Sequence, residues 1–230
     1  LADLTLRCEI GYPSVLTAPT WGFYDVSLKG NSLSFPMSYG SYVMENILFK
    51  ISFPAEFHSQ TAAEAAVRLH PEVKDRLDEI EKIVIHTHES AIRIISKVGP
   101  LNNPADRDHC LQYMTAVPLA FGNLVAENYE DSFHRANPVI DELREKMEVH
   151  ENTQYSAEYL EADKRSIANC LQVFFKDGTA TGAAEIHYPV GHRRRREEGI
   201  PLLEEKFQSN LATRFPAKRC EEIYGLCKDQ

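Results

Sequence analysis

Lys50, Glu56 and His58 form one group of residues whose side chains could bind an anion and transfer a proton. Lys50 ends a short apolar run, and a helix is expected to have Pro54 in its first turn. The ammonium group and the free N–H groups of a first helical turn both attract anions. Each residue also has a simple structural interpretation: a solvated strand end, a carboxylate facing the helix dipole and a hydrogen-bonded helix residue.

A second group lies on a helix that is expected to run from Pro104 through Ala120. Asp106, His109 and Tyr113 are spaced i, i+3, i+7, which places them on one face of a continuous helix. A histidine and a tyrosine one turn apart could relay a proton. The alternative is that Asp106 caps the helix and that Tyr113 is a buried core residue.

The start of the same helix offers groups that bind carboxylates. Arg107 can hold a carboxylate with two hydrogen bonds, and the amides of Asn102 and Asn103 can donate further ones. Asn103 is equally a natural N-cap, with Pro104 at the first helical position. Capping and ligand binding therefore both remain open for these residues.

Two other motifs have weaker functional interpretations. His86 and His88 would point to one side of a strand, as zinc ligands do, but no third ligand is evident. A surface or hydrogen-bonded pair is expected instead. The arginine run 193–196 is followed at once by Glu197 and Glu198. A solvated or domain-bridging loop is therefore expected in place of a nucleic-acid patch.

Composition narrows the class of protein. The formal charge of −9 argues against general binding to nucleic acid or to an anionic membrane surface. With 43% hydrophobic and 26% charged residues, the chain has the composition of an ordinary globular protein. The cysteines include no C-x-x-C pair, so no zinc ribbon, iron–sulfur cluster or other metal site is expected. They are Cys8, Cys110, Cys170, Cys220 and Cys227.

The elements that must position these groups indicate an α+β fold. Apolar, β-branched runs predict strands at residues 47–51 and 83–87. Asp177-Gly178 between two such runs predicts a β-hairpin. Helices are expected at residues 89–97, 104–120, 138–147, 201–212 and 216–226. Residues 1–9 look like the tail of a helix that continues from an upstream part.

Four stretches carry a family resemblance. They are GYPSVLTAPTWGFYDV (11–26), YGSYVMENILFKISFPAEFHSQTAAEAA (39–66), GPLNNPADRDHCLQYM (99–114) and YPVGHRRRREEGIPLLEEKF (188–207). Together they closely resemble the 2-methylcitrate dehydratase branch of the MmgE/PrpD family. The resemblance implies a lid domain at residues 47–190, with an antiparallel sheet and helices. It also implies that residues 1–46 and 191–230 belong to an all-helical core domain.

The resemblance implies a hydro-lyase that converts 2-methylcitrate to 2-methyl-cis-aconitate in the methylcitrate cycle of propionate catabolism. Family members of this branch form homodimers and work without an iron–sulfur cluster or another cofactor. The expected compartment is the mitochondrial matrix in a eukaryote and the cytoplasm in a bacterium. Two alternatives stay open. One is a relative that hydrates or decarboxylates cis-aconitate, and the other is a catalytically incomplete fragment, because the family's N-terminal helical region has no counterpart here.

The resemblance also assigns residues to the site. In this family the segment F-K-x-x-F-P-A lines the cleft, which favours Lys50 as a binder of substrate carboxylates. The related decarboxylases carry histidine where this chain has Glu56, which leaves the acid–base role open between Glu56 and His58. The Q-Y pair of related lyases supports Tyr113. The expected catalytic residues are Tyr113, His58, His109 and Glu56, and the expected substrate-binding residues are Lys50, Arg107, Asn102 and Asn103.

Overall fold

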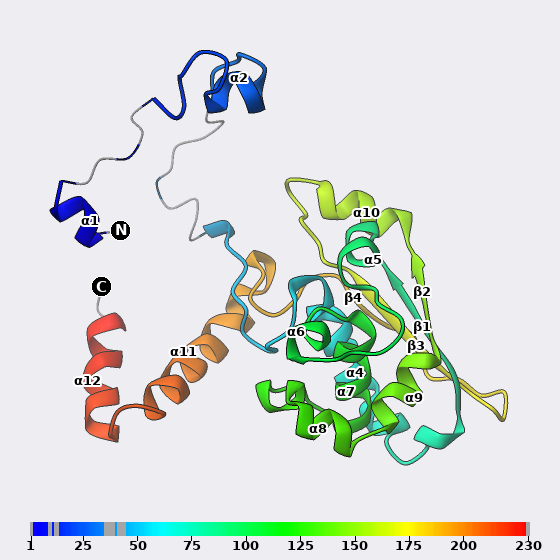
Figure 1. Cartoon of the computed structure of the whole chain (residues 1–230). Coiled ribbons are helices and arrows are strands. Elements are labelled where there is room, and N and C mark those ends of the chain that lie inside the picture. The colour runs from blue at the N-terminus through cyan, green and yellow to red at the C-terminus, as the bar shows by residue number, and fades with distance from the viewer. Residues whose placement is uncertain (1, 9–10, 12–13, 35–39, 41–44, 229–230) are drawn as a thin grey trace. The chain divides into compact units, whose positions relative to one another are not determined.

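The computed structural model describes residues 2–8, 11, 14–34, 40 and 45–228. Its contacts divide the chain into two compact units, Leu1–Glu45 and Asn46–Gln230 (Figure 1). In the first unit, the described part contains two short helices, α1 (Ala2–Leu6) and α2 (Phe23–Leu28). The expectation of a helix at the start of the chain is confirmed over α1.

A mixed four-stranded sheet forms the centre of the second unit, with the strand order β2-β1-β3-β4. β1 (Ile80–Thr87) pairs in parallel with β2 (Met147–Glu151) and antiparallel with β3 (Asn169–Phe175). β4 (Ala184–Ile186) pairs antiparallel with β3. The predicted strand at residues 83–87 and the predicted hairpin are confirmed. The α+β class is also confirmed, but the sheet is mixed because β2 runs parallel to β1.

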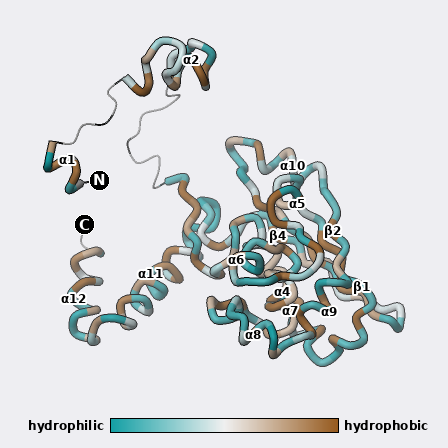
Figure 2. The backbone as a smooth tube through the Cα atoms, in the orientation of Figure 1, coloured by the Kyte–Doolittle hydropathy of each residue, from teal (hydrophilic) through white to brown (hydrophobic). Residues whose placement is uncertain are grey.

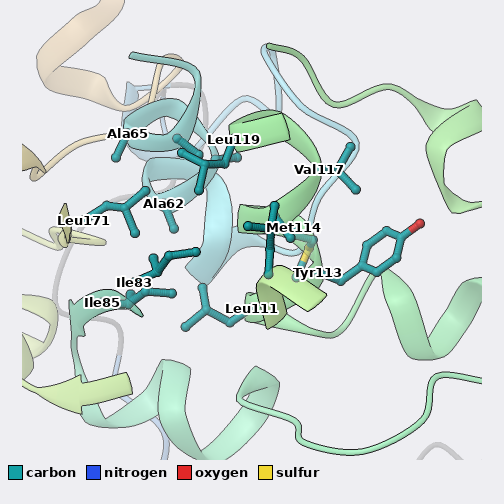
Figure 3. Packing of buried hydrophobic residues seen from close by; sticks show 14 of the residues in the cluster. Ala62, Ala65, Ile83, Ile85, Leu111, Tyr113, Met114, Val117, Leu119 and Leu171 are labelled. Atoms are coloured by element: carbon teal, nitrogen blue, oxygen red, sulfur yellow. The ribbon is translucent and has the colours of Figure 1, made fainter. Parts of the chain in front are cut away.

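Two helices pack on the sheet and on each other to form the hydrophobic core (Figure 3). α4 (Gln60–Val73) contributes four fully buried alanines, whose small side chains let α7 (Leu111–Phe121) and the sheet approach closely. Buried isoleucines of β1 and leucines of α7 meet in this layer. Burial of such side chains contributes about 25 cal/mol per Å² of apolar area, so this layer is the main source of stability.

Shorter helices surround this core, and the last two helices of the chain form a pair that extends from it (Figure 1). The expected helices at residues 89–97 and 138–147 are confirmed. The expected helix at 201–212 begins earlier, at Arg196, and the one at 216–226 ends later, at Lys228. The other helical elements are η1 (Phe57–Ser59), η2 (Leu77–Glu79), α5 (Glu89–Ile95), α6 (Pro104–Arg107), η3 (Ala126–Tyr129), α8 (Asp131–Ala136), α9 (Val139–Glu145), α10 (Thr153–Leu160), η4 (Arg193–Arg195), α11 (Arg196–Ala212) and α12 (Ala217–Lys228).

Helix α11 begins before Pro201, the residue that the sequence marks as a helix start. Five residues of α11 precede Pro201, so this proline lies beyond the first turn and its missing N–H removes one backbone hydrogen bond of the helix. Along α11 and α12 hydrophobic and hydrophilic residues alternate (Figure 2), and Phe215 and Leu226 are exposed. No helix in the described part of the chain is long and apolar enough to span a membrane.

The predicted strand at residues 47–51 is wrong. This segment joins no strand of the sheet and is held by one returning segment of the chain. The Phe49 N–H donates to the Gly191 carbonyl at 3.2 Å, and the Arg196 guanidinium lies 4.2 Å from the centre of the Phe49 ring. Gly191 has φ +98°, and a Cβ there would lie 2.1 Å from the Phe49 carbonyl oxygen. Only glycine therefore permits this close crossing.

The predicted single helix from Pro104 to Ala120 is also wrong. It is interrupted between α6 and α7, and Cys110 has an extended backbone with φ −122° and ψ 108°. Its thiol is fully buried against the Lys97 carbonyl at 3.7 Å. Burial of this side chain therefore accompanies the change in chain direction.

Candidate functional site

Glu56 and His58 lie next to each other in the turn that precedes α4. Glu56 is the N-cap of η1, and its carboxylate accepts a hydrogen bond from the His58 backbone N–H at 2.8 Å. The second carboxylate oxygen lies 2.7 Å from Nδ1 of the His58 ring. The two side chains are 16% and 11% exposed, so the pair is largely shielded from water while an edge stays accessible.

Buried polar side chains fix this turn. The Gln60 amide donates to two carbonyls of the preceding loop at 2.9 and 2.8 Å. The Asn169 amide, on β3, donates to the His58 carbonyl at 2.8 Å. The Ser59 hydroxyl lies 3.1 Å from the Met114 sulfur on α7. The backbone that carries the carboxylate and the imidazole is therefore tied to the sheet and to α7.

Electrostatics determine which nitrogen of His58 carries the proton. Burial raises the pKa of Glu56, but hydrogen bonds from His58, its positive charge and that of His109 lower it more, so the pKa lies below its usual value. An ionised carboxylate can only accept hydrogen bonds. The His58 Nδ1–H therefore donates to Glu56. In the neutral ring, Nε2 is then the unprotonated nitrogen.

Two aromatic side chains complete the cluster. The Tyr159 hydroxyl, from α10, lies 3.2 Å from His58 Nε2. The ring of His88, the N-cap of α5, stacks on Tyr159 with centroids 4.6 Å apart and an interplanar angle of 9°. It lies 5.1 Å from the His58 ring. Burial, assisted by the charge of His58, lowers the pKa of His88 to about 4, so this ring is neutral at physiological pH. Glu56, His58, His88 and Tyr159 are called the His58 cluster below.

Lys50 and His109 are both exposed. The Lys50 ammonium nitrogen lies 4.8 Å from the centre of the Phe57 ring within η1. Nδ1 of His109 lies 2.6 Å from the Asp108 carboxylate. The charge of His109 also contributes, as the smallest cause, to the lowered pKa of Glu56. Lys50 thus contacts the residue next to His58, and His109 contributes positive charge.

Tyr113 lies in the interior instead. Its side chain is fully buried in α7, and its hydroxyl donates to the Asn128 carbonyl at 2.6 Å. The ring stacks on Tyr129 and meets His134 edge-on. Burial raises the pKa of Tyr113 to about 12, although Arg107 lowers it in part. Its phenol is therefore engaged with the backbone and stays protonated.

Arg107 is likewise buried, with 1% of its surface exposed. Nε donates to the Tyr129 carbonyl at 2.7 Å, one terminal nitrogen contacts the Asp131 carboxylate, and the other lies 3.4 Å from His134 Nδ1. Arg107 therefore joins α6 to η3 and α8. Each of its three guanidinium nitrogens has a contact inside the protein.

The remaining predicted binding residues form a capping motif. The Asn103 side chain accepts from the Asp106 N–H at 2.9 Å, and Asp106 accepts from the Asn102 N–H at 3.0 Å. The expectation that Asp106 shares a helix face with His109 and Tyr113 is wrong, because the chain is interrupted between α6 and α7. The structure thus brings Glu56 and His58 together, whereas Tyr113 and Arg107 have a different set of partners in the interior.

Sequence reasoning missed Tyr159 and misjudged His88. His88 was expected to form a surface or hydrogen-bonded pair with His86, but the ring of His86 faces that of His150 at 5.7 Å. The position of His88 before the acidic start of α5 is a local hint of an N-cap. Nothing near Tyr159 in the sequence indicates its contact. Among the described residues, no group of three or more His, Cys, Asp or Glu side chains could hold a metal ion.

The arginine run connects segments of the second unit. Arg195 pairs with Glu64 on α4 at 2.8 Å and with Glu198 at 2.7 Å. Arg193 donates to the Asn46 side chain at 3.0 Å, and Arg196 donates to the carbonyl of Gly191 at 3.0 Å. The run therefore fixes the segment that precedes Lys50 against the segment that leads into α11.

Comparison with known proteins shows the family. The sequence model of the MmgE/PrpD C-terminal domain matches residues 53–230, which is most of the chain. The chain belongs to the MmgE/PrpD family. Within it, this MmgE/PrpD chain is 54% identical to the 2-methylcitrate dehydratase of Escherichia coli (strain K12) over 233 residues. The alignment covers 100% of this chain and 48% of that relative.

Two further relatives agree with this result. The 2-methylcitrate dehydratase of Cupriavidus necator is 55% identical, again over 100% of this chain and 48% of the relative. The protein of Yarrowia lipolytica named "2-methylcitrate dehydratase, mitochondrial" is 54% identical over 97% of this chain and 43% of the relative. This MmgE/PrpD chain spans about half the length of the curated relatives that it matches.

Proposed function

We propose that a protein of the relatives' length, with this chain as its C-terminal half, dehydrates 2-methylcitrate to 2-methyl-cis-aconitate in propionate catabolism. This protein is called the full-length protein below. Identity of 54% over the whole chain to proteins named 2-methylcitrate dehydratase supports the substrate. The structural observation that carries the proposal is the shielded Glu56–His58 pair at 2.7 Å.

Dehydration of a hydroxy-tricarboxylate removes a C–H proton next to a carboxylate and releases the neighbouring hydroxyl as water. A positioned base and acid typically accelerate such steps about 10²–10⁴-fold each. Neutral His58 can accept a proton at Nε2, and the Glu56 carboxylate stabilises the imidazolium that forms. Lys50 supplies a positive charge for a substrate carboxylate. His109 is a second group that can exchange a proton.

The roles predicted for Tyr113, Arg107, Asn102 and Asn103 stay predictions. In this structure Tyr113 would have to release the Asn128 carbonyl before its hydroxyl could meet a substrate. Arg107 would have to give up three internal partners. The His58 cluster needs no such rearrangement, and we therefore propose it as the centre of proton transfer.

The proposal extends to the assembly of the full-length protein. Residues 47–190 would form a lid over a helical core that includes residues 1–46 and 191–230. The full-length protein would be a homodimer and would need no iron–sulfur cluster. It would act in the mitochondrial matrix in a eukaryote, as the name of the Yarrowia lipolytica relative suggests, and in the cytoplasm in a bacterium. Support for these points comes from the family resemblance.

An absorbance assay for the conjugated alkene product tests the proposal. The full-length protein should convert 2-methylcitrate, with citrate and cis-aconitate as comparison substrates and a chelator in one arm. His58→Asn should lower kcat about a hundredfold. His86→Asn is the matched control, because the ring of His86 lies on β1 and contacts only His150 in the ring pairs of this region. Turnover of cis-aconitate without turnover of 2-methylcitrate would contradict the proposal, and loss of activity to the chelator would contradict independence from a cluster.

A further inference from the structure

The only nitrogen of the neutral His58 ring that can accept a proton is occupied by Tyr159. Nδ1–H is engaged with Glu56 at 2.7 Å, and the Tyr159 hydroxyl lies 3.2 Å from Nε2. Because neutral Nε2 carries a lone pair, the phenol O–H must be the donor in this contact. A substrate that exchanges a proton with Nε2 must therefore displace the phenol or react through it.

Burial favours reaction through the phenol. His58 is buried, whereas Tyr159 is half-buried. Tyr159 extends from α10, an element separate from the turn that carries His58. Of the two side chains that share the 3.2 Å contact, the phenol thus belongs to the more exposed residue.

His88 holds the phenol in place. Its ring is fully buried and lies flat on Tyr159, at 9°. Nδ1 accepts from the Ala91 N–H at 3.4 Å, and Nε2 has no hydrogen-bond partner among the described residues. A buried unsatisfied N–H costs about 1–3 kcal/mol. Because of this cost, an apolar side chain would fill the same space with less loss of stability than His88 does. The His88 ring, stacked on Tyr159, instead restricts the phenol to one plane.

We propose that Tyr159 is a catalytic residue through which His58 exchanges protons with the substrate, and that His88 is its positioning residue. This inference rests on the proposed dehydratase function. As the substrate C–H bond breaks, its proton goes to the Tyr159 oxygen while the phenol proton goes to His58 Nε2. The electron pair of the C–H bond forms the new C=C bond. The C–O bond breaks with its electron pair on oxygen.

The same chain then runs in reverse and restores the starting state. The proton on His58 Nε2 returns to the Tyr159 oxygen, and the phenol proton goes to the departing hydroxyl, which leaves as water. Glu56 balances the positive charge that His58 carries between the two transfers. Among the described residues, the titratable groups that contact the His58 ring are Glu56, the N-cap of η1, His88, the N-cap of α5, and Tyr159 from α10, and the charge of His109 also lowers the pKa of Glu56.

Tyr159→Phe tests the inference, with Tyr155→Phe as the matched control. Tyr155 also belongs to α10 and is buried, but its hydroxyl contacts Glu185. The first measurement is a long-range ¹H–¹⁵N NMR spectrum of the 230-residue chain, which reports the state of each imidazole nitrogen without any catalysis. Tyr159→Phe should move the Nε2 resonance of His58 toward that of a nitrogen with no hydrogen-bond donor, and Tyr155→Phe should leave it in place.

The second measurement is the pH profile of kcat and kcat/KM in the full-length protein. Tyr159→Phe should lower kcat about a hundredfold with KM changed by less than about threefold. It should also shift the acid limb of kcat/KM to higher pH, because a donor that favours neutral His58 is lost. Loss of packing alone would lower activity without moving this limb. Tyr155→Phe should preserve kcat, KM and the limb.

Three other results of these measurements would contradict the role of Tyr159 or the proposed function. An unchanged His58 Nε2 resonance would overturn the contact and the inference with it. A Tyr159→Phe variant within a few-fold of wild-type kcat, beside an inactive His58→Asn variant, would overturn the inference and leave the proposed function standing. A wild-type full-length protein that does not convert 2-methylcitrate would overturn the proposed function and the catalytic role of Tyr159 together.

Discussion

The two groups of residues that the sequence marks for chemistry have opposite environments in the structure. Around His58, polar atoms face one another across three elements, and half-buried Tyr159 and exposed Lys50 stay near the surface. Around Tyr113, the polar side chains contact partners in the interior. The Tyr113 hydroxyl donates to the Asn128 carbonyl, and Nε of Arg107 donates to the Tyr129 carbonyl.

This difference shows that residue type and spacing do not separate chemistry from architecture. Tyr113 on α7 and Arg107 on α6 both donate to backbone carbonyls of η3, at the buried residues Asn128 and Tyr129. Buried polar groups must be hydrogen-bonded, so the interior uses the same side chains that a carboxylate site would use. What distinguishes the two groups is how many internal hydrogen-bond partners their side chains already have. The predictions below test that distinction, from the largest expected effect to the smallest.

Arg107→Leu should mainly affect folding. The change removes the donor to the Tyr129 carbonyl and leaves a buried acceptor unsatisfied, which should cost about 2–3 kcal/mol in the free energy of unfolding. The ion pair with half-exposed Asp131 adds little to this figure. Urea unfolding of the chain measures the effect, with Arg135→Leu on exposed α8 as the control. Unchanged stability together with a raised KM of the full-length protein would make Arg107 a substrate clamp after all.

Glu56→Gln should mainly affect catalysis. A neutral amide stabilises the imidazolium of His58 less than a carboxylate does, so kcat should fall about ten- to a hundredfold while the fold persists. The same change should alter the acid side of the stability profile. Because the folded-state pKa of Glu56 is lowered, its contribution is present above the unfolded carboxyl pKa and is lost as pH falls through the lowered one. Urea unfolding between about pH 3 and 6 should show this loss in wild type and a smaller one in the variant.

Tyr113→Phe should have a small structural effect. Loss of the hydrogen bond to the Asn128 carbonyl should lower the free energy of unfolding by about 1 kcal/mol. The ring keeps its contacts with Tyr129 and His134. If the phenol stays bound to the backbone during turnover, kcat should change by less than about threefold. A hundredfold loss of kcat in steady-state assays would instead show that Tyr113 leaves its carbonyl and transfers a proton, as the family resemblance implies.

Lys50→Met should have the smallest effect. The exposed ammonium group contacts the Phe57 ring and has no carboxylate partner among the described residues, so its removal should leave the stability of the chain within about 0.5 kcal/mol. A lost cation should raise KM for 2-methylcitrate about five- to tenfold with kcat nearly constant. Weaker inhibition by citrate should accompany this rise. A constant KM would assign Lys50 to the solvated surface.

Local elements could be predicted where one principle dominates. An apolar, β-branched run identified β1, and Asp177-Gly178 identified the turn between β3 and β4. Asn103 before Pro104 identified the N-cap of α6. The predictions failed where distant contacts override local preference. Cys110 is extended in the middle of a helical pattern, and the run at residues 47–51 meets Gly191 instead of a strand.

The sequence by itself determined the α+β class and the family, and it drew attention to Glu56 and His58 near the start of α4. Those follow from periodicity over a few residues and from long matching strings. Only the tertiary structure decided what His58 faces, since Tyr159 lies 101 positions away along the chain. It also decided that Tyr113 and Arg107 turn inward. Hydrogen-bond partners depend on which surfaces the packed sheet and helices bring together, and no local rule of helix or strand formation encodes contacts over such separations.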